Sequence, residues 1–530
     1  MGLIAHMARF WVCDSCMWRW FADTFKGPRH CPKRRFLCLI PIFLCCSLGW
    51  AQTPTLVQTA YCPNSGPANS GGSNGNGVVN GVYTCPLPSA SLANDFIVVS
   101  VFFQGGTGQT LTLKDNASNS YSQDVTNTTA GGNIQSIYHL ANAGAGITYV
   151  RGSFSGGAAT GFVNVIVSEW NNVATSSPLD VAHCNSGSSS SVTAGSASIG
   201  TANDLLIQPV FSDDHGSVSS FAAGSQSNIT WRFGATDLID AAAFQYGVYG
   251  ATGSFKPTFT QGTSHSFASC FAAFKTASSG STPSGNRPLM ISHAQIPPGA
   301  GTTPFKMQVP FSGNLQVISF LGGFETITSI SSTPSCTWLS TGPEHNSGNP
   351  DNYTQIYYAM NCTGNAVAIN VTLNGSADGD TLMTYDITGP NPWTFDTDSG
   401  GQDANENGDI PNFTTCSGCD TPTTSTGVVF ANFGQDQCTA TGVTAPAGAV
   451  FDAANYTGNS LSGPQDVDEN NGWLHLFYNS SPGAITATWA DDCPTLTPES
   501  FWAGRVASFK SGAQSSSQPS PPTGLKLTVH

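Results

Sequence analysis

The segment Ser136–Phe154 (SIYHLANAGAGITYVRGSF) has a counterpart in the second half of the chain, Gln355–Leu373 (QIYYAMNCTGNAVAINVTL). Both begin with Ile-Tyr and an aromatic or His residue, reach a Gly-bearing turn, and continue as a second apolar stretch. Residues 148–154 alternate between apolar and polar side chains, and this period of two is typical of a strand with one buried face. The pair therefore predicts strand–turn–strand units that occur once in each half of the chain.

Further segments recur in the same order around this pair. They are Phe162–Trp170 with Thr381–Gly389, Asn203–Phe211 with Thr426–Gly434, and Phe267–Gly280 with Phe501–Gly512. No stretch has the pattern of a capped amphipathic helix, and Gly, Asn and Ser separate the short apolar runs. We predict an all-β protein of two tandem antiparallel β-sandwich domains of jelly-roll type, the second a divergent repeat of the first. The expected boundaries are a leader at 1–51, domains at 52–276 and 288–512, a linker at 277–287 and a Ser/Pro-rich tail at 513–530.

The start of the chain resembles an export signal. Lys33, Arg34 and Arg35 precede the apolar run Phe36–Leu48, and Gly49-Trp50-Ala51 offers small residues at a cleavage site. The run is shorter than the roughly 20 residues that a membrane helix needs, so a cleaved leader is favoured over a membrane anchor. We therefore expect a secreted, extracellular protein with no integral membrane segment in the mature chain.

Charge argues against two classes of partner. The 530 residues have a formal net charge of −15, and residues 1–51 contain seven of the seventeen Lys and Arg but two of the thirty-two Asp and Glu. The remainder is thus still more acidic, and most of its acidic residues lie in the second half. Nucleic acid and anionic membranes need a basic footprint, so neither is an expected partner.

Ten cysteines follow the leader, an even number that favours disulfides in an exported chain. We expect the pairs Cys62–Cys85, Cys184–Cys270, Cys336–Cys362, Cys416–Cys419 and Cys438–Cys493, although spacing alone leaves other connectivities open. The Cys416–Cys419 pair could instead be a redox pair, but the strand–helix context of a thioredoxin site is missing.

A resemblance supports the extracellular assignment. The stretches NDFIVVSVFF, LTLKDNASNSYSQ, SEWNNVATSSPLDVA and FAAFK are similar to a functionally uncharacterised module of secreted bacterial proteins, often found in tandem or beside fibronectin type III domains. Residues 90–276 fit well, and the second half is a divergent copy without the SPLDVA phrase. Pro521–Val529 resembles the first strand of a fibronectin type III domain. The resemblance implies an extracellular sandwich and transfers no catalytic residue.

One acidic loop has the spacing of a calcium site. Asp403, Asn405, Asn407 and Asp409 surround Gly408 in a D-x-N-x-N-G pattern, and calcium prefers such hard oxygen ligands. Thr414 stands where a bidentate acid is expected, so the loop is not an EF-hand, and an acidic loop without metal is the alternative. The segment Asp466–Gly472 is a second acidic candidate. Calcium is the only cofactor that the sequence suggests.

Residues for catalysis are harder to find. Glu169 and Asp386 occupy matching strand positions in the two halves, and a residue type that recurs in both copies more often serves the fold than an active site. The only G-x-S-x-G match, Gly71–Gly75, lies in a low-complexity loop. Trp393, Trp473 and Trp338 have loop-like neighbours, and exposed indole rings can stack on sugars, so they are the candidate ligand-binding residues.

Three functions remain open after these observations. The preferred hypothesis is a secreted, non-enzymatic binding or adhesion protein for an extracellular glycan or cell-surface component. A structural surface or matrix protein is the first alternative, and it predicts that Trp393 and Trp473 are buried. A polysaccharide-active enzyme is the second, and it predicts two acids across a groove. A sandwich fold can serve all three.

Overall fold

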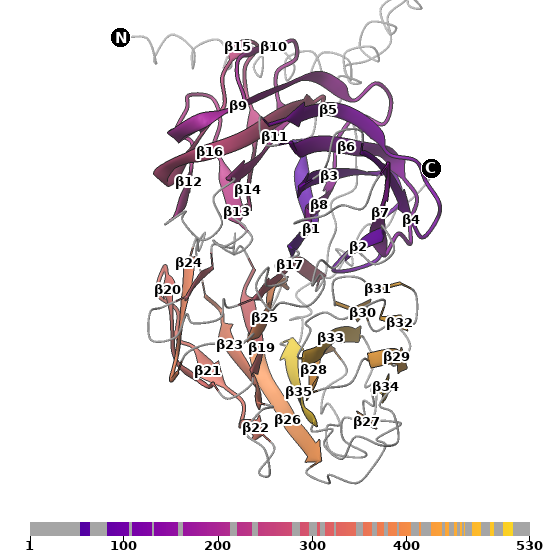
Figure 1. The fold of residues 1–530 in the computed structure, drawn as a ribbon, viewed down its shortest axis with the longest axis vertical. Coiled ribbons are helices and arrows are strands. Elements are labelled where there is room, and N and C mark those ends of the chain that lie inside the picture. Colours follow the sequence, from indigo (N-terminus) through magenta and orange to yellow (C-terminus); the bar gives the residue numbers. More distant parts are fainter. Residues whose placement is uncertain are drawn as a thin grey trace, which may run out of the picture. The chain divides into compact units, whose positions relative to one another are not determined.

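The computed structural model describes residues 53–63, 82–104, 109–129, 132–156, 163–212, 220–235, 242–277, 287–295, 305–307, 313–322, 325–345, 353–362, 368–375, 380–389, 392–403, 413–414, 426–436, 440–444, 450–452, 456–457, 460–461, 469–478, 488–491 and 502–511. Every regular element within these ranges is a strand, so the predicted all-β class is confirmed (Figure 1). In the same ranges no helix is long and apolar enough to cross a membrane. The predicted leader, the tail and residues 278–286 of the predicted linker lie outside them.

A central sheet contains strands from both halves of the chain, in the order β21-β23-β19-β25-β17-β1-β8-β3-β6-β5, with β22 beside β23. The strands are β1 (Thr55–Pro63), β3 (Asp95–Gln104), β5 (Ser122–Thr128), β6 (Asn133–Ala143), β8 (Val163–Asn171), β17 (Arg287–Gln295), β19 (Leu315–Gly322), β21 (Leu339–Ser340), β22 (Glu344–His345), β23 (Tyr353–Met360) and β25 (Thr381–Thr388). β1 and β17 pair in parallel, whereas the other pairings described in this sheet are antiparallel. One continuous sheet therefore contains strands from both of the predicted domains.

Two further sheets belong to the first half. The larger has the order β12-β16-β11-β14-β13, with β9 also beside β16. Its strands are β9 (Leu179–Thr193), β11 (Asp204–Ser212), β12 (Phe221–Ala223), β13 (Arg232–Ala235), β14 (Ala242–Tyr249) and β16 (Thr258–Phe274). The smaller contains β2 (Val82–Pro86), β7 (Tyr149–Ser155) and β4 (Thr110–Asp115), and a short pair joins β10 (Ala197–Ile199) to β15 (Gly253–Phe255).

The second half repeats this arrangement. Its larger sheet has the order β26-β35-β28-β33-β30, formed by β26 (Trp393–Asp403), β28 (Gly427–Asp436), β30 (Val450–Phe451), β33 (Glu469–Tyr478) and β35 (Trp502–Ser511). A smaller sheet contains β18 (Phe305–Met307), β24 (Ala368–Leu373) and β20 (Ile327–Thr333). The remaining strands are β27 (Phe413–Thr414), β29 (Ala440–Thr444), β31 (Tyr456–Thr457), β32 (Ser460–Leu461) and β34 (Thr488–Asp491).

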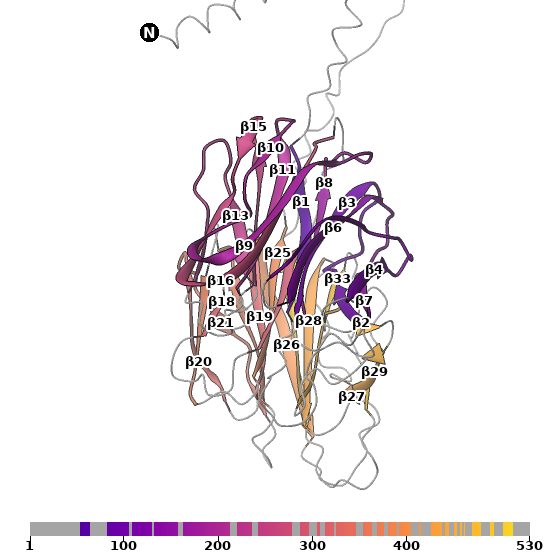
Figure 2. The same ribbon diagram turned by 45° about the horizontal axis from the view of Figure 1, so that its top comes forward.

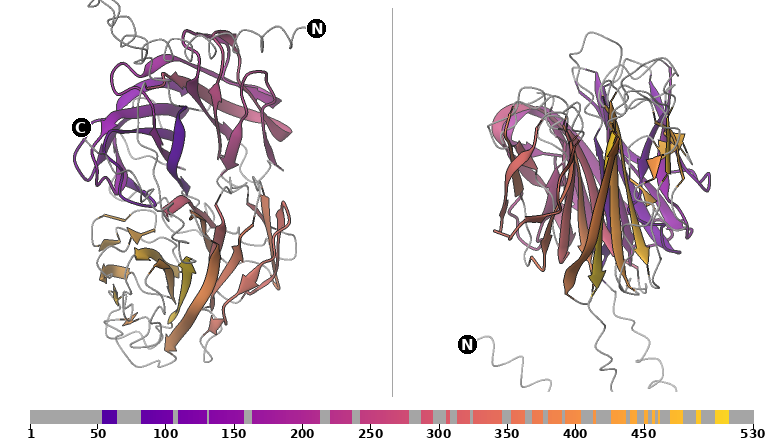
Figure 3. Two further views of the ribbon diagram at one scale, coloured as in Figure 1. Left: turned by 180° about the vertical axis from the view of Figure 1, so that it is seen from behind. Right: turned by 90° about the horizontal axis from the view of Figure 1, so that it is seen from below.

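The central sheet has a hydrophobic core on each face. All nine residues of β8 are buried, with Val165 and Val167 in one core and Ile166 and Trp170 in the other. The first core also receives side chains from β2, β28, β33 and β35, and the second from β11, β14, β16 and β24. The layers can be followed in Figure 2 and in the two views of Figure 3. The prediction of one buried face suits β7 of an outer sheet, where burial alternates from residue to residue, but not these central strands.

The recurring sequence segments occupy equivalent places in these sheets. Outward from the central pair, β1-β8-β3-β6-β5 corresponds to β17-β25-β19-β23-β21. In the outer sheets, β16-β11-β14 corresponds to β35-β28-β33. The two larger outer sheets pack on opposite faces of the central sheet, because their side chains belong to different cores. The parallel β1–β17 pairing accounts for this exchange of faces. Half a turn of one half about an axis along the strands keeps the strand direction and exchanges the two faces of the sheet.

Candidate functional site

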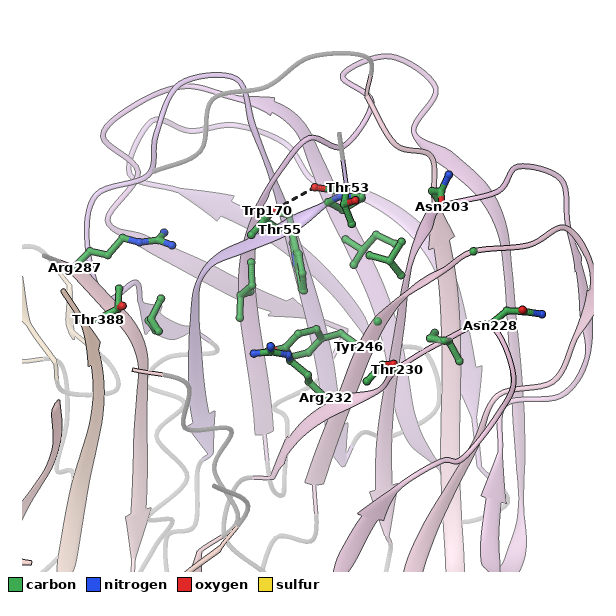
Figure 4. A pocket seen from close by; sticks show the side chains of 18 residues that line it. Thr53, Thr55, Trp170, Asn203, Asn228, Thr230, Arg232, Tyr246, Arg287 and Thr388 are labelled. Atoms are coloured by element: carbon green, nitrogen blue, oxygen red, sulfur yellow. Dashed lines mark hydrogen bonds between the residues drawn. The ribbon is translucent and has the colours of Figure 1, made fainter. Parts of the chain in front are cut away.

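A cleft of about 780 Å³ is formed mainly by the first half of the chain, with Arg287, Leu289 and Thr388 contributed by β17 and β25 (Figure 4). The start of β1 and the end of β8 contribute Thr53, Thr55 and Trp170, and β14 contributes Tyr246. The first residues of β13 and β17, Arg232 and Arg287, also line it. Its volume lies in the range of small-molecule sites.

Two aromatic side chains line the buried part of the cleft. The rings of Trp170 and Tyr246 meet edge to face, with centroids 5.0 Å apart. The Trp170 indole Nε1 donates a hydrogen bond to the Ser168 hydroxyl, 2.8 Å away, which fixes the ring on β8. Both side chains belong to the core between β8 and β14. The two rings are therefore nearly buried apolar groups packed at the inner side of the cleft.

Arg232 is exposed and stands opposite Tyr246 in the β13–β14 pairing. The two residues are cross-strand neighbours, and their side chains interact electrostatically. Burial raises the pKa of Tyr246 to about 12, and the charge of Arg232 opposes that rise. At neutral pH the phenol is protonated, and Figure 4 shows the Arg232 and Tyr246 side chains next to each other at the cleft.

Arg287 lies half-buried at another part of the cleft wall (Figure 4). Its Nη1 donates to the carbonyl oxygen of Val57 in β1 at 2.8 Å. Partial burial lowers the pKa of the guanidinium, while attraction to Glu169 and Asp95 opposes that shift. An arginine remains charged despite such a shift, so Arg287 is a second fixed cation in this site.

Asp95 and Glu169 form a buried carboxyl pair near Arg287. Burial is the main cause that raises the pKa of Glu169 to about 8; the charge of Asp95 contributes to this rise, and the donors Gln58 and Leu92 oppose it. Burial also raises the pKa of Asp95, and its hydrogen bond to Glu169 and the charge of Arg287 oppose this. A pKa of about 8 corresponds to a protonated Glu169 at neutral pH. Neither lines the cleft.

Glu169 also fixes a loop through its hydrogen bonds. Its Oε1 accepts from the backbone N–H of Leu92 at 2.7 Å, and its Oε2 accepts from the Gln58 side chain. In the second half, Asp386 accepts from the backbone N–H of Gly313 at 3.0 Å and from Gln316 Nε2 at 3.1 Å. Both carboxyls are fully buried. Their shared position therefore serves the fold in both halves, in line with the expectation from sequence.

The part of the second half equivalent to the cleft contains a buried polar network. Tyr246 and His475 are equivalent, because they pair with Ile207 and Phe430, which themselves face Ala272 and Ala507. His475 Nδ1 lies 2.9 Å from the Asp452 carboxylate, and the Tyr385 hydroxyl donates to it at 2.8 Å.

All three members of this network are buried. Burial raises the pKa of Asp452, and the interactions with His475 and Tyr385 oppose this. Tyr385 lies one residue before Asp386, as Ser168 lies one residue before Glu169. A Tyr therefore stands in the second half where the first half has a Ser.

The structure corrects the role expected for two tryptophans. Trp393 and Trp473 are both 0 % exposed and belong to the core, so neither presents a ring face to a ligand. Trp473 lies in β33 opposite Asn432 of β28, within a sheet rather than in a loop. Trp393 begins β26, and its Nε1 donates to Asn314 Oδ1 at 2.9 Å. Trp338 is half-buried, packs against the second core and does not line the cleft.

The other predicted sites have different outcomes. Three expected disulfides are present, Cys62–Cys85, Cys184–Cys270 and Cys336–Cys362, with Cα atoms 5.7, 4.0 and 5.6 Å apart. Cys416, Cys419, Cys438 and Cys493 lie outside the residues that the structure describes. The same is true of Asn405, Asn407 and Asp409, while Asp403 is the last residue of β26. Elsewhere in the described ranges, no group of three His, Cys, Asp or Glu residues is placed to hold a metal ion.

Sequence reasoning did not find Arg232 or Arg287. Each is the first residue of a strand, far from the other along the chain, and neither belongs to a motif. The one available signal is scarcity, because the chain contains only 17 Lys and Arg among 530 residues.

No known protein family, curated protein or solved structure matches the chain.

Proposed function

We propose that this chain is an exported, non-enzymatic binding protein that holds an extracellular saccharide in the cleft of its first half. The observation that carries the proposal is the composition of the cleft wall. Its rim bears the hydroxyl and amide side chains of Thr53, Thr55, Asn203, Asn228, Thr230 and Thr388, beside the buried side chains of Trp170 and Tyr246. Sugars present several hydroxyl groups together, which such a wall of polar side chains complements.

The three disulfides are compatible with an extracellular location. A glycosidase needs two carboxyl groups on either side of its substrate. Among the described residues that line this cleft there is no Asp or Glu, and the buried Asp95–Glu169 pair is turned to the other core. These observations favour binding over hydrolysis for this cleft.

The second candidate is a structural surface protein without a discrete ligand. The burial of Trp393 and Trp473 is what that hypothesis predicts. The cleft argues for a ligand, since a purely structural protein has no need of two arginines at an open concave surface. The two hypotheses therefore differ in one measurable property, which is saturable binding at the cleft.

The test is an array of neutral and acidic glycans probed with the purified, oxidised chain, followed by titration calorimetry on the best ligand. Thr230 is an exposed residue of the cleft wall, and Thr112 is an exposed residue of β4 outside it. We expect Thr230→Trp to fill the cleft and abolish binding, and Thr112→Trp to leave it unchanged. A folded chain that binds no glycan would overturn the proposal and favour the structural protein.

A further inference from the structure

The charge of the cleft is opposite to that of the chain. The protein has a net charge of −15, yet the formally charged residues among the described lining are Arg232 and Arg287, both positive. A positive site in an acidic protein attracts a small anion while the surrounding surface repels large polyanions. The positive charge of the cleft therefore indicates a negatively charged ligand.

Arg232 has guanidinium N–H donors that are available to a ligand. The side chain is exposed, lies beside the Tyr246 phenol and forms no ion pair with a described carboxylate. A guanidinium carries five N–H donors in a planar fork that matches the oxygens of an oxyanion. The exposed guanidinium beside Tyr246 is therefore accessible to a ligand.

Arg287 is held in place by the protein at the same cleft. One Nη is committed to the carbonyl of Val57, and the rest of the half-buried guanidinium is next to the cleft. The Asp95–Glu169 pair behind it offsets part of the cost of burying its charge. Immobilised donors in a partly desolvated setting bind an anion more tightly than mobile surface lysines.

The equivalent region of the second half has different side chains. Where the first half has Tyr246 beside an exposed Arg232, the second half has His475 paired with the buried Asp452. The residue equivalent to Arg232 is Val450, because β13 and β30 pair with Tyr246 and His475 at these positions. The cation at the cleft is thus particular to the first half and is not required by the shared fold.

We propose that the ligand of this cleft is an acidic saccharide whose oxyanion, a uronic carboxylate or a sulfate ester, is bound by Arg232 and Arg287. The proposal rests on the saccharide-binding function proposed above. Arg232 supplies the accessible donors, and Arg287 supplies the second positive charge at the wall. The hydroxyl-bearing rim then contacts the neutral part of the same sugar.

Titration calorimetry on the full chain tests this with three probes: a trimer of galacturonic acid, its methyl ester, and a sulfated galactose oligosaccharide. The methyl ester has the same rings and hydroxyls without the charge. We expect it to bind about tenfold more weakly than the acid or worse. The acid's affinity should also fall as salt is raised. Preference for the sulfated probe would identify sulfate as the source of the oxyanion and would equally support the proposal.

The decisive variants are Arg232→Gln and Arg232→Lys, with Arg151→Gln as the matched control. Arg151 lies on β7, over the ring of Tyr149 and outside the cleft. We expect Arg232→Gln to weaken the acidic probe about tenfold or more, Arg232→Lys to restore part of the loss, and Arg151→Gln to have no effect. Arg232 is exposed, so its variants should keep the wild-type denaturation midpoint; Arg287→Gln is the confirming variant, scored only if its midpoint is also retained.

The outcomes separate the two proposals. Binding of neutral glycans that is equal to binding of acidic ones, or that survives Arg232→Gln with an acidic probe, would overturn the acidic-saccharide inference and leave the saccharide-binding function standing. A folded protein that binds none of the probes and none of the array would overturn both.

Discussion

Glu169 and Asp386 are buried carboxyls at equivalent places in the two halves, and each accepts a hydrogen bond from the backbone of the loop that leads into a neighbouring strand. Glu169 accepts from Leu92, three residues before β3 begins, and Asp386 accepts from Gly313, two residues before β19 begins. The carboxyl therefore positions the entry to a central strand in both halves.

The first prediction concerns the stability that this contact provides. Asp386→Ala leaves the Gly313 N–H and a Gln316 amide hydrogen without their acceptor, and each buried donor left unpaired costs roughly 1–3 kcal/mol. We expect a loss of about 2–4 kcal/mol in the free energy of unfolding, measured by denaturant titration. Lys256→Ala, at an exposed position, should stay within about 0.5 kcal/mol of wild type. A loss for Asp386→Ala no larger than that of the control would show that the carboxyl does not hold the loop.

This contact also shows what could be predicted from sequence. Matching the segments of the two halves aligned Glu169 with Asp386 and predicted a structural role for both. Alternation of apolar and polar residues suited outer strands such as β7, and pairing the cysteines within each half of the chain matched three disulfides. These features depend on local pattern, which a strand expresses directly in its sequence.

The cleft could not be predicted in this way. Thr55, Arg232 and Arg287 come from three distant parts of the chain, and only the pairing of β1 with β17 and of β13 with β14 brings them to one place. Trp473 shows the reverse error. Its neighbours Asn471 and Gly472 indicated a loop, but ten consecutive pairings between β28 and β33 place them in a strand. Tertiary pairing overrides local propensity at such positions.

The second prediction is a decline in stability between about pH 5 and 8. Glu169 has its pKa raised from an ordinary value of 4.5 to about 8, so in this window the folded chain retains a proton that the unfolded chain has released. A folded state that binds more protons loses stability as pH rises, by up to about 1.4 kcal/mol per pH unit for one proton. Asp204, with its pKa raised mainly by burial to about 6, acts in the same direction.

Glu169→Gln isolates the contribution of Glu169. The amide cannot ionise, so the plot of unfolding free energy against pH should be flatter in the variant than in wild type, and the difference should be largest near pH 7. Denaturant titrations at five or six pH values are sufficient. Parallel curves for the two proteins would mean that Glu169 is ionised in the folded chain at neutral pH.

The third prediction compares two disulfides of different span. Cys184–Cys270 joins β9 to β16 across 86 residues, whereas Cys62–Cys85 spans 23. A crosslink restricts the unfolded chain more when the loop is longer, so the model of loop entropy gives roughly 4–5 kcal/mol for the first and 3–4 for the second. Paired Cys→Ala replacements, compared by denaturant titration under oxidising conditions, should show the larger loss for Cys184 and Cys270. The reverse order would indicate that packing around the half-cystines, rather than chain entropy, dominates.

The last prediction uses two buried tyrosines whose hydroxyls differ in their partners. The Tyr385 hydroxyl donates to Asp452 at 2.8 Å, whereas the Tyr61 hydroxyl has no hydrogen-bond partner among the described residues. Tyr385→Phe leaves Asp452 with one donor fewer, and hydrogen bonds to a carboxylate contribute about 1.5–3 kcal/mol, so we expect a loss of that size. Tyr61→Phe removes a hydroxyl that is buried without compensation, and it should be neutral or slightly stabilising. The two substitutions delete the same atom from side chains that are each 0–1 % exposed, so the difference between their unfolding free energies measures the contact with Asp452. Equal losses would show that the Tyr61 hydroxyl finds a hydrogen-bond partner in solution.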